Sequence, residues 1–380
     1  MRPVCEWFIV SLASNLFVPN KPIAIDLFSG GGGLTLGLQA AGFDVVFGID
    51  NWEYAAECYE SNINHPCYVE DLSENPVAKV RKYLNDRRPN LIAGGPPCQG
   101  FSTLGKRDDD DPRNELFRSF VSVVESLKPD FFVMENVAGL IVSGDGNRAQ
   151  QVVERFVEAG YSDTKFQVVT AADYGVPQLR QRVIFFGSLN GSLPYELPSR
   201  EFRPEQYITV KDAIFDLPSL ESGETSEEYL VEPFTEYQSK LRGNCNVLHN
   251  HQAANHPPHL VEIISHVPDG GNRKSIPDHL QPSSGFHNSY SRLASDKPAI
   301  AITSNMRKPS SARGTHPIQN RGLTVREGLR LQSFPDSYIL PNGRTKQYVV
   351  VGNAVPPVLF EKLFANLANK FAEGSLAIVN

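Results

Sequence analysis

The sequence predicts an α/β fold, a doubly wound and mostly parallel sheet accompanied by a smaller second domain. Through the first half of the chain, short apolar runs rich in β-branched residues alternate with helical stretches. The first of these runs leads directly into a glycine-rich loop and then a helix, the order found in nucleotide-binding sheets. From about residue 197 the composition changes to Pro, Ser, Asn and His with few long apolar runs, which indicates a second domain.

The apolar runs predict the strands in order. Strands are expected at 23–28, 45–49, 67–69, 91–93, 131–134, 164–170 and 183–187, and a helix at 34–41, where Gly42 ends it. The connection between the last two strands is short and contains Gly175 and Pro177, so it leaves little room for a crossover helix. These two strands are therefore predicted to form an antiparallel hairpin. One more strand is expected at 298–303, after the polar region.

These elements give a domain organisation. With 380 residues, 41% of them hydrophobic, the chain is long enough for one large domain and a smaller one. Residues 1–20 are predicted to be an N-terminal extension, 21–196 the large domain, 197–322 the second domain, 323–352 a hinge, and 353–380 a segment that returns to the large domain.

The composition indicates in which cellular compartment the protein works. Five cysteines form no Cys-x-x-Cys pair and leave at least one thiol unpaired, which is typical of a reducing compartment, so a cytoplasmic protein without a disulfide framework is predicted. The apolar run at 7–10 is too short to span a bilayer, and no membrane association is expected. The net charge of -7 argues mildly against a general nucleic-acid coat, but basic residues gather between 301 and 330.

Cys98 is the most informative single residue. It follows an apolar run, in a turn that contains Gly95, Pro96, Pro97 and Gly100. Proline fixes the backbone, while glycine allows a close approach to a ligand. An arbitrary cysteine is more often a small buried hydrophobe, but these neighbours favour a thiol displayed at the end of a strand, which is a candidate nucleophile.

The glycine loop at 30–33 and the acidic residue Asp50 predict a cofactor site. Asp50 ends the second strand 20 residues after Gly30, where a carboxylate can accept hydrogen bonds from ribose hydroxyls. Trp52 could lay its ring against an adenine. The loop does not complete Gly-x-Gly-x-x-Gly, because Thr35 stands at the third position, and this counts against a nicotinamide enzyme. A glycine-rich turn without a ligand remains the alternative.

Polar side chains follow two further strands. Glu135 and Asn136 come after the run at 131–134, and alternation in the segment 178–182 directs Gln178, Arg180 and Arg182 to one side if it is extended. Ligands bind at the carboxyl edge of parallel sheets, so a cysteine, a glutamate and two arginines are predicted to converge there. Taken singly, Glu135 could be a helix cap or half of a surface ion pair, and the arginines a solvated face.

With these residues in place, the chain strongly resembles the cytosine-C5 DNA methyltransferase family, in its bacterial restriction-modification type. The matching segments, in the family order, are 26–30, 95–99, 135–137, 178–182, 321–327 and 352–357. The resemblance covers nearly the whole chain except the first twenty residues and roughly 201–289. One such segment is modest evidence, whereas the ordered set is highly specific.

The resemblance implies methylation of a cytosine flipped out of duplex DNA, with S-adenosyl-L-methionine as the cofactor. Cytosine C5 is a poor nucleophile, so a Cys98 thiolate would add to C6 and make C5 enamine-like. Glu135 would hold N3 and the exocyclic amine. Arg180 would contact O2, and Arg182 would lie near the catalytic centre, where positive charge favours the thiolate.

The resemblance also implies the binding residues. Phe28 would contact adenine, the backbone of Ser29, Gly30, Gly31, Gly32 and Gly33 the methionine part, Asp50 the ribose, and Asp71 the adenine amine, with Trp52, Leu116, Asn353, Ala354 and Val355 completing the pocket. Residues 197–322 would form a target-recognition domain. DNA contacts are expected from Gln99, Ser102, Lys106, Arg107, Asn136, Arg273, Lys274, Arg307, Lys308 and Arg313.

One departure and several alternatives stand beside this interpretation. Residues 108–111 are four adjacent aspartates that would repel phosphates, in a loop expected to close over DNA. Cys245 and the histidines at 249, 251, 256 and 259 fit no standard zinc spacing, so no metal is expected. The expected partners are double-stranded DNA and a restriction endonuclease that acts separately from a monomeric enzyme. A tRNA cytosine methyltransferase and a noncatalytic DNA-binding protein remain alternatives, though the long second domain and an intact Cys98 argue against them.

Overall fold

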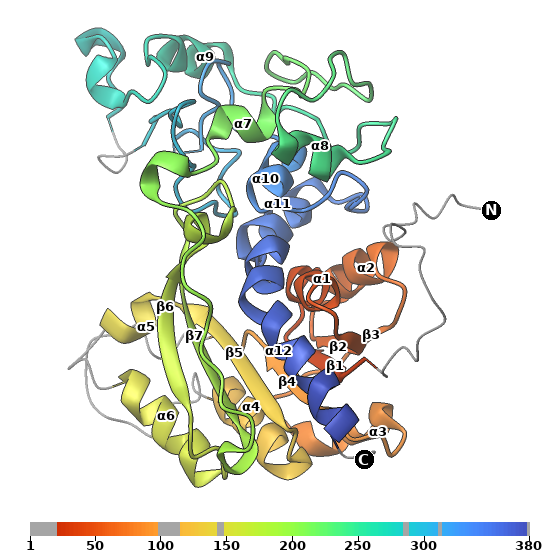
Figure 1. The fold of residues 1–380 in the computed structure, drawn as a ribbon. Coiled ribbons are helices and arrows are strands. Elements are labelled where there is room, and N and C mark those ends of the chain that lie inside the picture. The colour runs from red at the N-terminus through yellow and green to blue at the C-terminus, as the bar shows by residue number, and fades with distance from the viewer. Residues whose placement is uncertain (1–20, 98–114, 143–147, 284–288, 311–313, 378–380) are drawn as a thin grey trace.

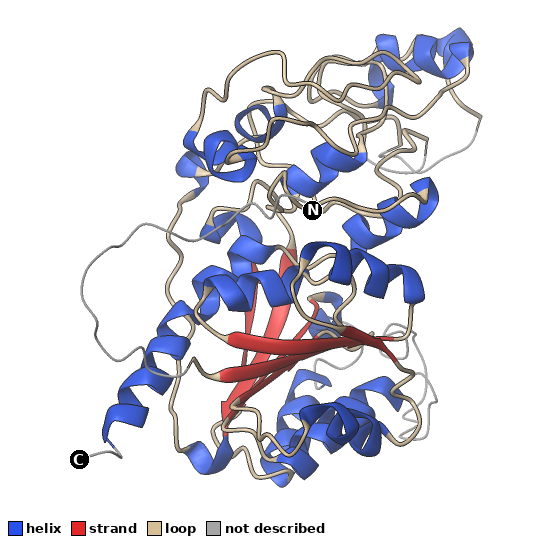
Figure 2. Cartoon of the chain, turned by 90° about the vertical axis from the view of Figure 1, so that its right-hand side faces the viewer, coloured by secondary structure: helices blue, strands red, loops and turns tan. Residues whose placement is uncertain are grey.

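The computed structural model describes residues 21–97, 115–142, 148–283, 289–310 and 314–377. One part of the chain builds a twisted sheet with helices on both faces, and the other is a domain of short helices and long loops (Figures 1 and 2). The predicted α/β class is confirmed.

The sheet has seven strands in the order β3-β2-β1-β4-β5-β7-β6. The strands are β1 (Ile23–Leu27), β2 (Asp44–Asp50), β3 (Cys67–Val69), β4 (Leu91–Gly94), β5 (Phe131–Val137), β6 (Lys165–Thr170) and β7 (Gln181–Ser188). Neighbouring strands pair in parallel except at β7, which is antiparallel to both β5 and β6. The β6–β7 hairpin was predicted from its short connection. The carboxyl ends of β1, β2, β4 and β5 thus share one edge of the sheet.

Helices cover both faces of the sheet. On one face lie α1 (Gly33–Ala40), α2 (Glu53–Asn62) and α12 (Pro357–Ala377), and on the other α3 (Pro76–Leu84), α4 (Glu115–Leu127), α5 (Gly139–Val142) and α6 (Arg148–Glu158). The other domain contains α7 (Val210–Ile214), α8 (Glu236–Arg242) and α9 (Pro258–Ser265), followed by α10 (Val325–Leu331) and α11 (Arg344–Asn353).

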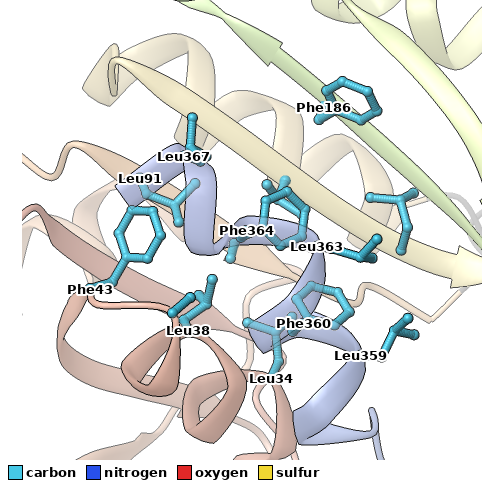
Figure 3. Packing of buried hydrophobic residues seen from close by; sticks show 14 of the residues in the cluster. Leu34, Leu38, Phe43, Leu91, Phe186, Leu359, Phe360, Leu363, Phe364 and Leu367 are labelled. Atoms are coloured by element: carbon cyan, nitrogen blue, oxygen red, sulfur yellow. The ribbon is translucent and has the colours of Figure 1, made fainter. Parts of the chain in front are cut away.

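The C-terminal helix α12 belongs to the core of the sheet domain. Leu359, Phe360 and Phe364 are fully buried against Leu34 and Leu38 of α1 (Figure 3). The stretch Arg344–Phe371 is long and apolar enough to cross a membrane, but 61% of its apolar window is buried inside the protein. Its apolar residues are therefore accounted for by packing in the core. The chain leaves the sheet domain, builds the second domain and then returns.

Charged residues occupy the interior of the second domain. Arg321 donates to both oxygens of Glu327 at 2.6 and 2.9 Å, and Arg330 bonds Asp336 at 2.5 Å and Asp216 at 3.2 Å. Close pairing of this kind compensates for the cost of removing the charges from water. The basic composition of residues 301–330 is thus partly internal: Arg321, Arg326 and Arg330 are fully buried and add no positive charge to the surface.

The strand expected at 298–303 does not form. In this segment Ala299 alone makes a bridge, a parallel one to Gln178. The reason lies in the hydrogen bonding of Ile302, whose N–H and carbonyl are bonded to side chains instead of a neighbouring strand. The proposed boundaries at 197, 323 and 353 stay predictions. Residues of α10 and α11 pack in one hydrophobic cluster with α7.

Candidate active site

A cavity of about 330 Å³ opens at the carboxyl edge of β4 and β5. Its volume falls in the range of small-molecule sites, roughly 300–1,000 Å³. It is lined by Gly95, Pro96, Pro97, Glu135, Asn136, Val137, Arg180, Arg182, Gly352 and Asn353. Segments far apart in the sequence thus converge, and three of the predicted catalytic residues lie in one place.

Glu135 and Arg182 form an ion pair across two strands. Their strands β5 and β7 are adjacent and antiparallel, with Val137 opposite Arg182. Arg182 Nε lies 2.6 Å from Glu135 Oε1, and the two side chains are only 13% and 11% exposed. A short, poorly hydrated pair of this kind fixes the orientation of both groups. The second carboxylate oxygen, Glu135 Oε2, lies beside Gly95, 3.3 Å from where a Cβ would stand.

Arg180 is buried with one donor unpaired. It is 4% exposed, and its Nη1 donates to the carbonyls of Ile302 at 3.1 Å and Gly352 at 3.4 Å. Its Nε has no hydrogen-bond partner among the described residues. Burial, and secondly the charge of Arg182, lowers the pKa of Arg180 to about 9. A buried donor without an acceptor is rare in native proteins, so this site suits a ligand oxygen.

Asn136 forms a hydrogen bond to the turn that precedes Cys98. Its Nδ2 donates to the carbonyl of Pro96 at 2.9 Å, so the end of β5 is tied to the end of β4. Cys98 itself lies outside the described residues. So do the predicted DNA contacts Gln99, Ser102, Lys106 and Arg107 and the aspartates at 108–111.

The glycine loop is joined to the next strand by Asp50. The carboxylate accepts from Gly30 N at 2.8 Å and from Trp52 N at 2.9 Å. Burial raises the pKa of Asp50. Phe28 enters the loop with φ of 60°, a strained conformation for a non-glycine residue. A Cβ on Gly30 would meet nothing within 4 Å, so open space adjoins the loop next to Asp50. These residues fit a ribose-containing cofactor.

The other predicted cofactor residues share this edge of the sheet but differ in exposure. Trp52 is half-buried, with its ring centroid 5.5 Å from that of Tyr54. Asp71, after β3, is exposed, and its Oδ1 accepts from Ser73 N. Leu116 is half-buried in the first turn of α4.

The C-terminal part of the chain closes the loop from the other side. Tyr338 Oη donates to the carbonyl of Gly31 at 2.6 Å, and a Cβ on Gly33 would lie 2.2 Å from the carbonyl oxygen of Val355. The turn at 353–355 was expected here, and it does lie against the loop. Tyr338 was not expected, because its partner is 307 residues away and no local pattern marks it.

Replacing Gly33 with alanine is expected to weaken binding of the cofactor that the family resemblance implies. The new methyl group overlaps the Val355 carbonyl, and overpacking of this kind costs about 1–3 kcal/mol. Calorimetric titration with S-adenosylmethionine should show a Kd raised about tenfold. Gly139→Ala is the matched control, since a Cβ there meets nothing within 4 Å. An unchanged Kd in Gly33→Ala contradicts the placement of the cofactor at this loop.

Of the predicted DNA-contacting residues of the second domain, those that the structure describes do not line the cavity. Arg273 is half-buried and donates to the carbonyl of Pro282, while Lys274 and Lys308 are exposed. The Arg307 guanidinium lies 5.5 Å from the centroid of the Tyr348 ring. Arg313 lies outside the described residues.

Two of the predicted histidines of the second domain, His251 and His256, have structural partners. His251 bonds Thr324 through Nδ1 and the carbonyl of Pro218 through Nε2, and His256 Nε2 accepts from Gly322 N. Within the described ranges, no group of three or more His, Cys, Asp or Glu side chains is arranged to hold a metal ion.

The sheet order, the glycine loop and the cavity define an S-adenosylmethionine-dependent methyltransferase fold. The family model for C-5 cytosine-specific DNA methylases matches residues 23–369, and the chain belongs to this family. It is a DNA cytosine-5-methyltransferase, as the sequence predicted.

Similar proteins support this assignment over most of the chain. The type II methyltransferase M1.HphI of Haemophilus parahaemolyticus is 40% identical over 343 residues, 89% of this chain and 84% of that protein. M.DdeI of Desulfomicrobium norvegicum is 35% identical over 89% of this chain and 86% of its own length. A crystal structure described as a prophage-encoded DNA modification methyltransferase of Escherichia coli superposes with a TM-score of 0.74 at 26% identity, covering 92% of this chain and 99% of that one.

Proposed function

We propose that the cavity receives a cytosine flipped out of duplex DNA and that Cys98 attacks its C6 atom. The observation that carries this proposal is the convergence of Glu135, Arg180 and Arg182 in one cavity, beside the turn that leads to Cys98. Chemistry on a base requires the base to leave the helical stack and enter such a pocket.

Each side chain has a distinct task in this reaction. The Cys98 thiolate forms a bond to C6 while the Glu135 carboxyl relays a proton from solvent to N3, so that C5 becomes an enamine carbon. The unpaired Nε of Arg180 suits the base oxygen O2. Arg182 holds the Glu135 carboxyl through its 2.6 Å contact. After methylation of C5, the C5 proton passes to solvent, the N3 proton leaves through the Glu135 carboxyl and the thiolate departs, which restores the aromatic ring.

The cofactor would be held by the glycine loop, with Asp50 at the ribose. When bound, S-adenosylmethionine supplies the electrophilic methyl group. Asp50 suits this task because its carboxylate is already oriented by two backbone N–H groups and still has lone pairs free for hydroxyl donors. Phe28, Trp52, Asp71 and Leu116 would complete the adenosine side.

Sequence recognition is assigned to the second domain. Lys274 and Lys308 are exposed and can meet phosphates, while Arg273 and Arg307 offer guanidinium groups suited to base edges. The type II relatives suggest a separate restriction endonuclease that cuts the same sequence. A monomer in the cytoplasm, where the DNA is accessible, completes the proposal.

Covalent trapping tests the proposed mechanism. Bisulfite sequencing of DNA from cells that express the protein first identifies the methylated sequence. A duplex carrying 5-fluorocytosine at that position is then expected to form a stable adduct with the wild-type enzyme and cofactor, because fluorine at C5 prevents release of the thiolate. The adduct is detected as a mass increase on a denaturing gel. Methylation of ordinary DNA without any adduct would overturn the role of Cys98.

A further inference from the structure

Two buried glutamines join segments that meet beside Arg180. Gln178 and Gln332 are both fully buried. Gln178 Nε2 donates to Gln332 Oε1 at 2.9 Å and to the carbonyl of Leu331 at 3.1 Å, while Gln332 Nε2 donates to the carbonyl of Val351 at 2.7 Å. Since a buried amide is costly to leave unpaired, these bonds fix both side chains. They link the start of the β7 segment to α10 and to the end of α11.

The same network binds both the backbone N–H and the carbonyl of Ile302, a residue of the second domain. Ile302 N donates to Gln178 Oε1 at 2.7 Å, and its carbonyl accepts from Arg180 Nη1 at 3.1 Å. The two side chains come from the alternating sequence Gln178-Leu179-Arg180, which places them on the same side of the chain. Ile302 precedes Arg307, a predicted DNA contact, by five residues. A displacement of this segment on DNA therefore acts directly on Gln178 and Arg180.

The network continues from these residues to the cavity. The adjacent carbonyls of Val351 and Gly352 accept from Gln332 and Arg180 respectively. A Cβ on Gly352 would lie 2.1 Å from Ser304 N, so the end of α11 is in backbone contact with the second-domain segment. Gly352 and Asn353 line the cavity, and Val355 touches the glycine loop.

We propose that Gln178 and Gln332 are positioning residues that couple recognition of the correct DNA sequence to alignment of the active site. This inference rests on the proposed function. When the second domain binds its target sequence, a change in the position of Ile302 moves the side chains of Gln178, Gln332 and Arg180. These side chains in turn move the segment 352–355, which borders both the base cavity and the cofactor loop. Discrimination then occurs in the rate of the reaction as well as in DNA binding.

Gln332→Met tests the coupling, because methionine fills a similar volume and cannot make the hydrogen bonds of the glutamine amide. The Kd for the target duplex is expected to change by less than about twofold. The single-turnover methylation rate is expected to fall about tenfold or more, since small misplacements in a site have large kinetic effects. The ratio of rates on the target and on a duplex altered at one base should also fall. A normal rate with a normal ratio overturns the proposal.

A double-mutant cycle with Gln178→Met asks whether the glutamines act as one unit. If they do, the double variant should be no more than about twofold slower than the slower single variant, because the first change already breaks the link. If the rate of the double variant falls by the product of the two single-variant reductions, the glutamines act independently and a shared role is overturned. Gln178→Met alone provides the same rate and ratio measurements if Gln332→Met does not fold.

Gln238→Met is the matched control for loss of a buried amide. Gln238 is also fully buried, accepts from Phe234 N at 2.9 Å and donates to the carbonyl of Lys211 at 3.3 Å, within the second domain. It is expected to lower the melting temperature without changing the methylation rate. An equal loss of rate in this control identifies the effect as general destabilisation and overturns the proposal.

Trapping on 5-fluorocytosine DNA distinguishes failure of the proposed coupling from failure of the proposed mechanism. A wild-type enzyme that forms no adduct with 5-fluorocytosine DNA contradicts the mechanism. A wild-type enzyme that forms the adduct, together with a Gln332→Met variant that forms it equally fast, contradicts the coupling alone. The coupling predicts slow trapping that reaches the wild-type extent.

Discussion

Cys98→Ser is expected to reduce methyl transfer to duplex DNA by about 10⁴-fold or more while leaving the Kd for S-adenosylmethionine nearly unchanged. A serine hydroxyl is a far weaker nucleophile than a thiol, which is a few per cent ionised at neutral pH. No predicted contact of the cofactor involves this side chain. Transfer of a labelled methyl group and calorimetric cofactor titration measure the two quantities on the same preparation.

Cys245→Ser is the control for this exchange. Cys245 is a half-buried cysteine in the second domain, away from the cavity-lining residues, and its replacement is expected to leave turnover intact. Substantial turnover in Cys98→Ser would rule out attack by this thiol. Loss of cofactor binding along with turnover would show that Cys98 supports the structure of the site instead.

Glu135→Gln is expected to lower the rate by about 10²–10⁴-fold, the usual contribution of a positioned acid. Glutamine keeps the shape of the side chain but cannot deliver a proton to N3. The exchange also removes the charge that holds Arg182 Nε at 2.6 Å. The rate of adduct formation on 5-fluorocytosine DNA should fall in parallel, because Glu135 acts at the addition step.

The comparison for Glu135→Gln is Glu158→Gln, which removes an exposed ion pair with Arg155 at 3.3 Å. Exposed pairs of this kind contribute about 0–1 kcal/mol, so activity should not change. A Glu135→Gln enzyme that forms the adduct as fast as wild type would assign proton delivery to another group.

The centre of the sheet could be predicted from sequence because β1, β4 and β5 are nearly continuous buried runs. Strands β1, β4 and β5 have both faces covered by helices, and their apolar residues therefore mark them without help from distant parts of the chain. The segment at 298–303 has the same apolar character, yet its backbone bonds go to Gln178 and Arg180. Composition does not distinguish a strand in a sheet from an extended segment held by side chains.

The site was predictable where chemistry and local sequence coincide. Glu135, Arg180 and Arg182 were identified from strand ends and alternation, and the structure brings them into one cavity. Tyr338, Gln332 and the buried pairing of Arg330 with Asp216 were not identified. Their partners are 307, 154 and 114 residues away, and only the folded chain brings such residues together.

The packing of α12 on α1 has a consequence for the order in which the protein can form during synthesis. The first helix of the chain buries its apolar face against residues near the C-terminus, and the glycine loop is closed by Tyr338 and Val355. A nascent chain that has emerged only as far as the second domain must keep Leu34 and Leu38 uncovered, exposed to chaperones and to aggregation. Contacts over such long sequence separations also slow folding. With the methyl donor held at the glycine loop as proposed, we expect the enzyme to bind it only after the ribosome has delivered nearly the whole polypeptide, and truncated products to stay inactive.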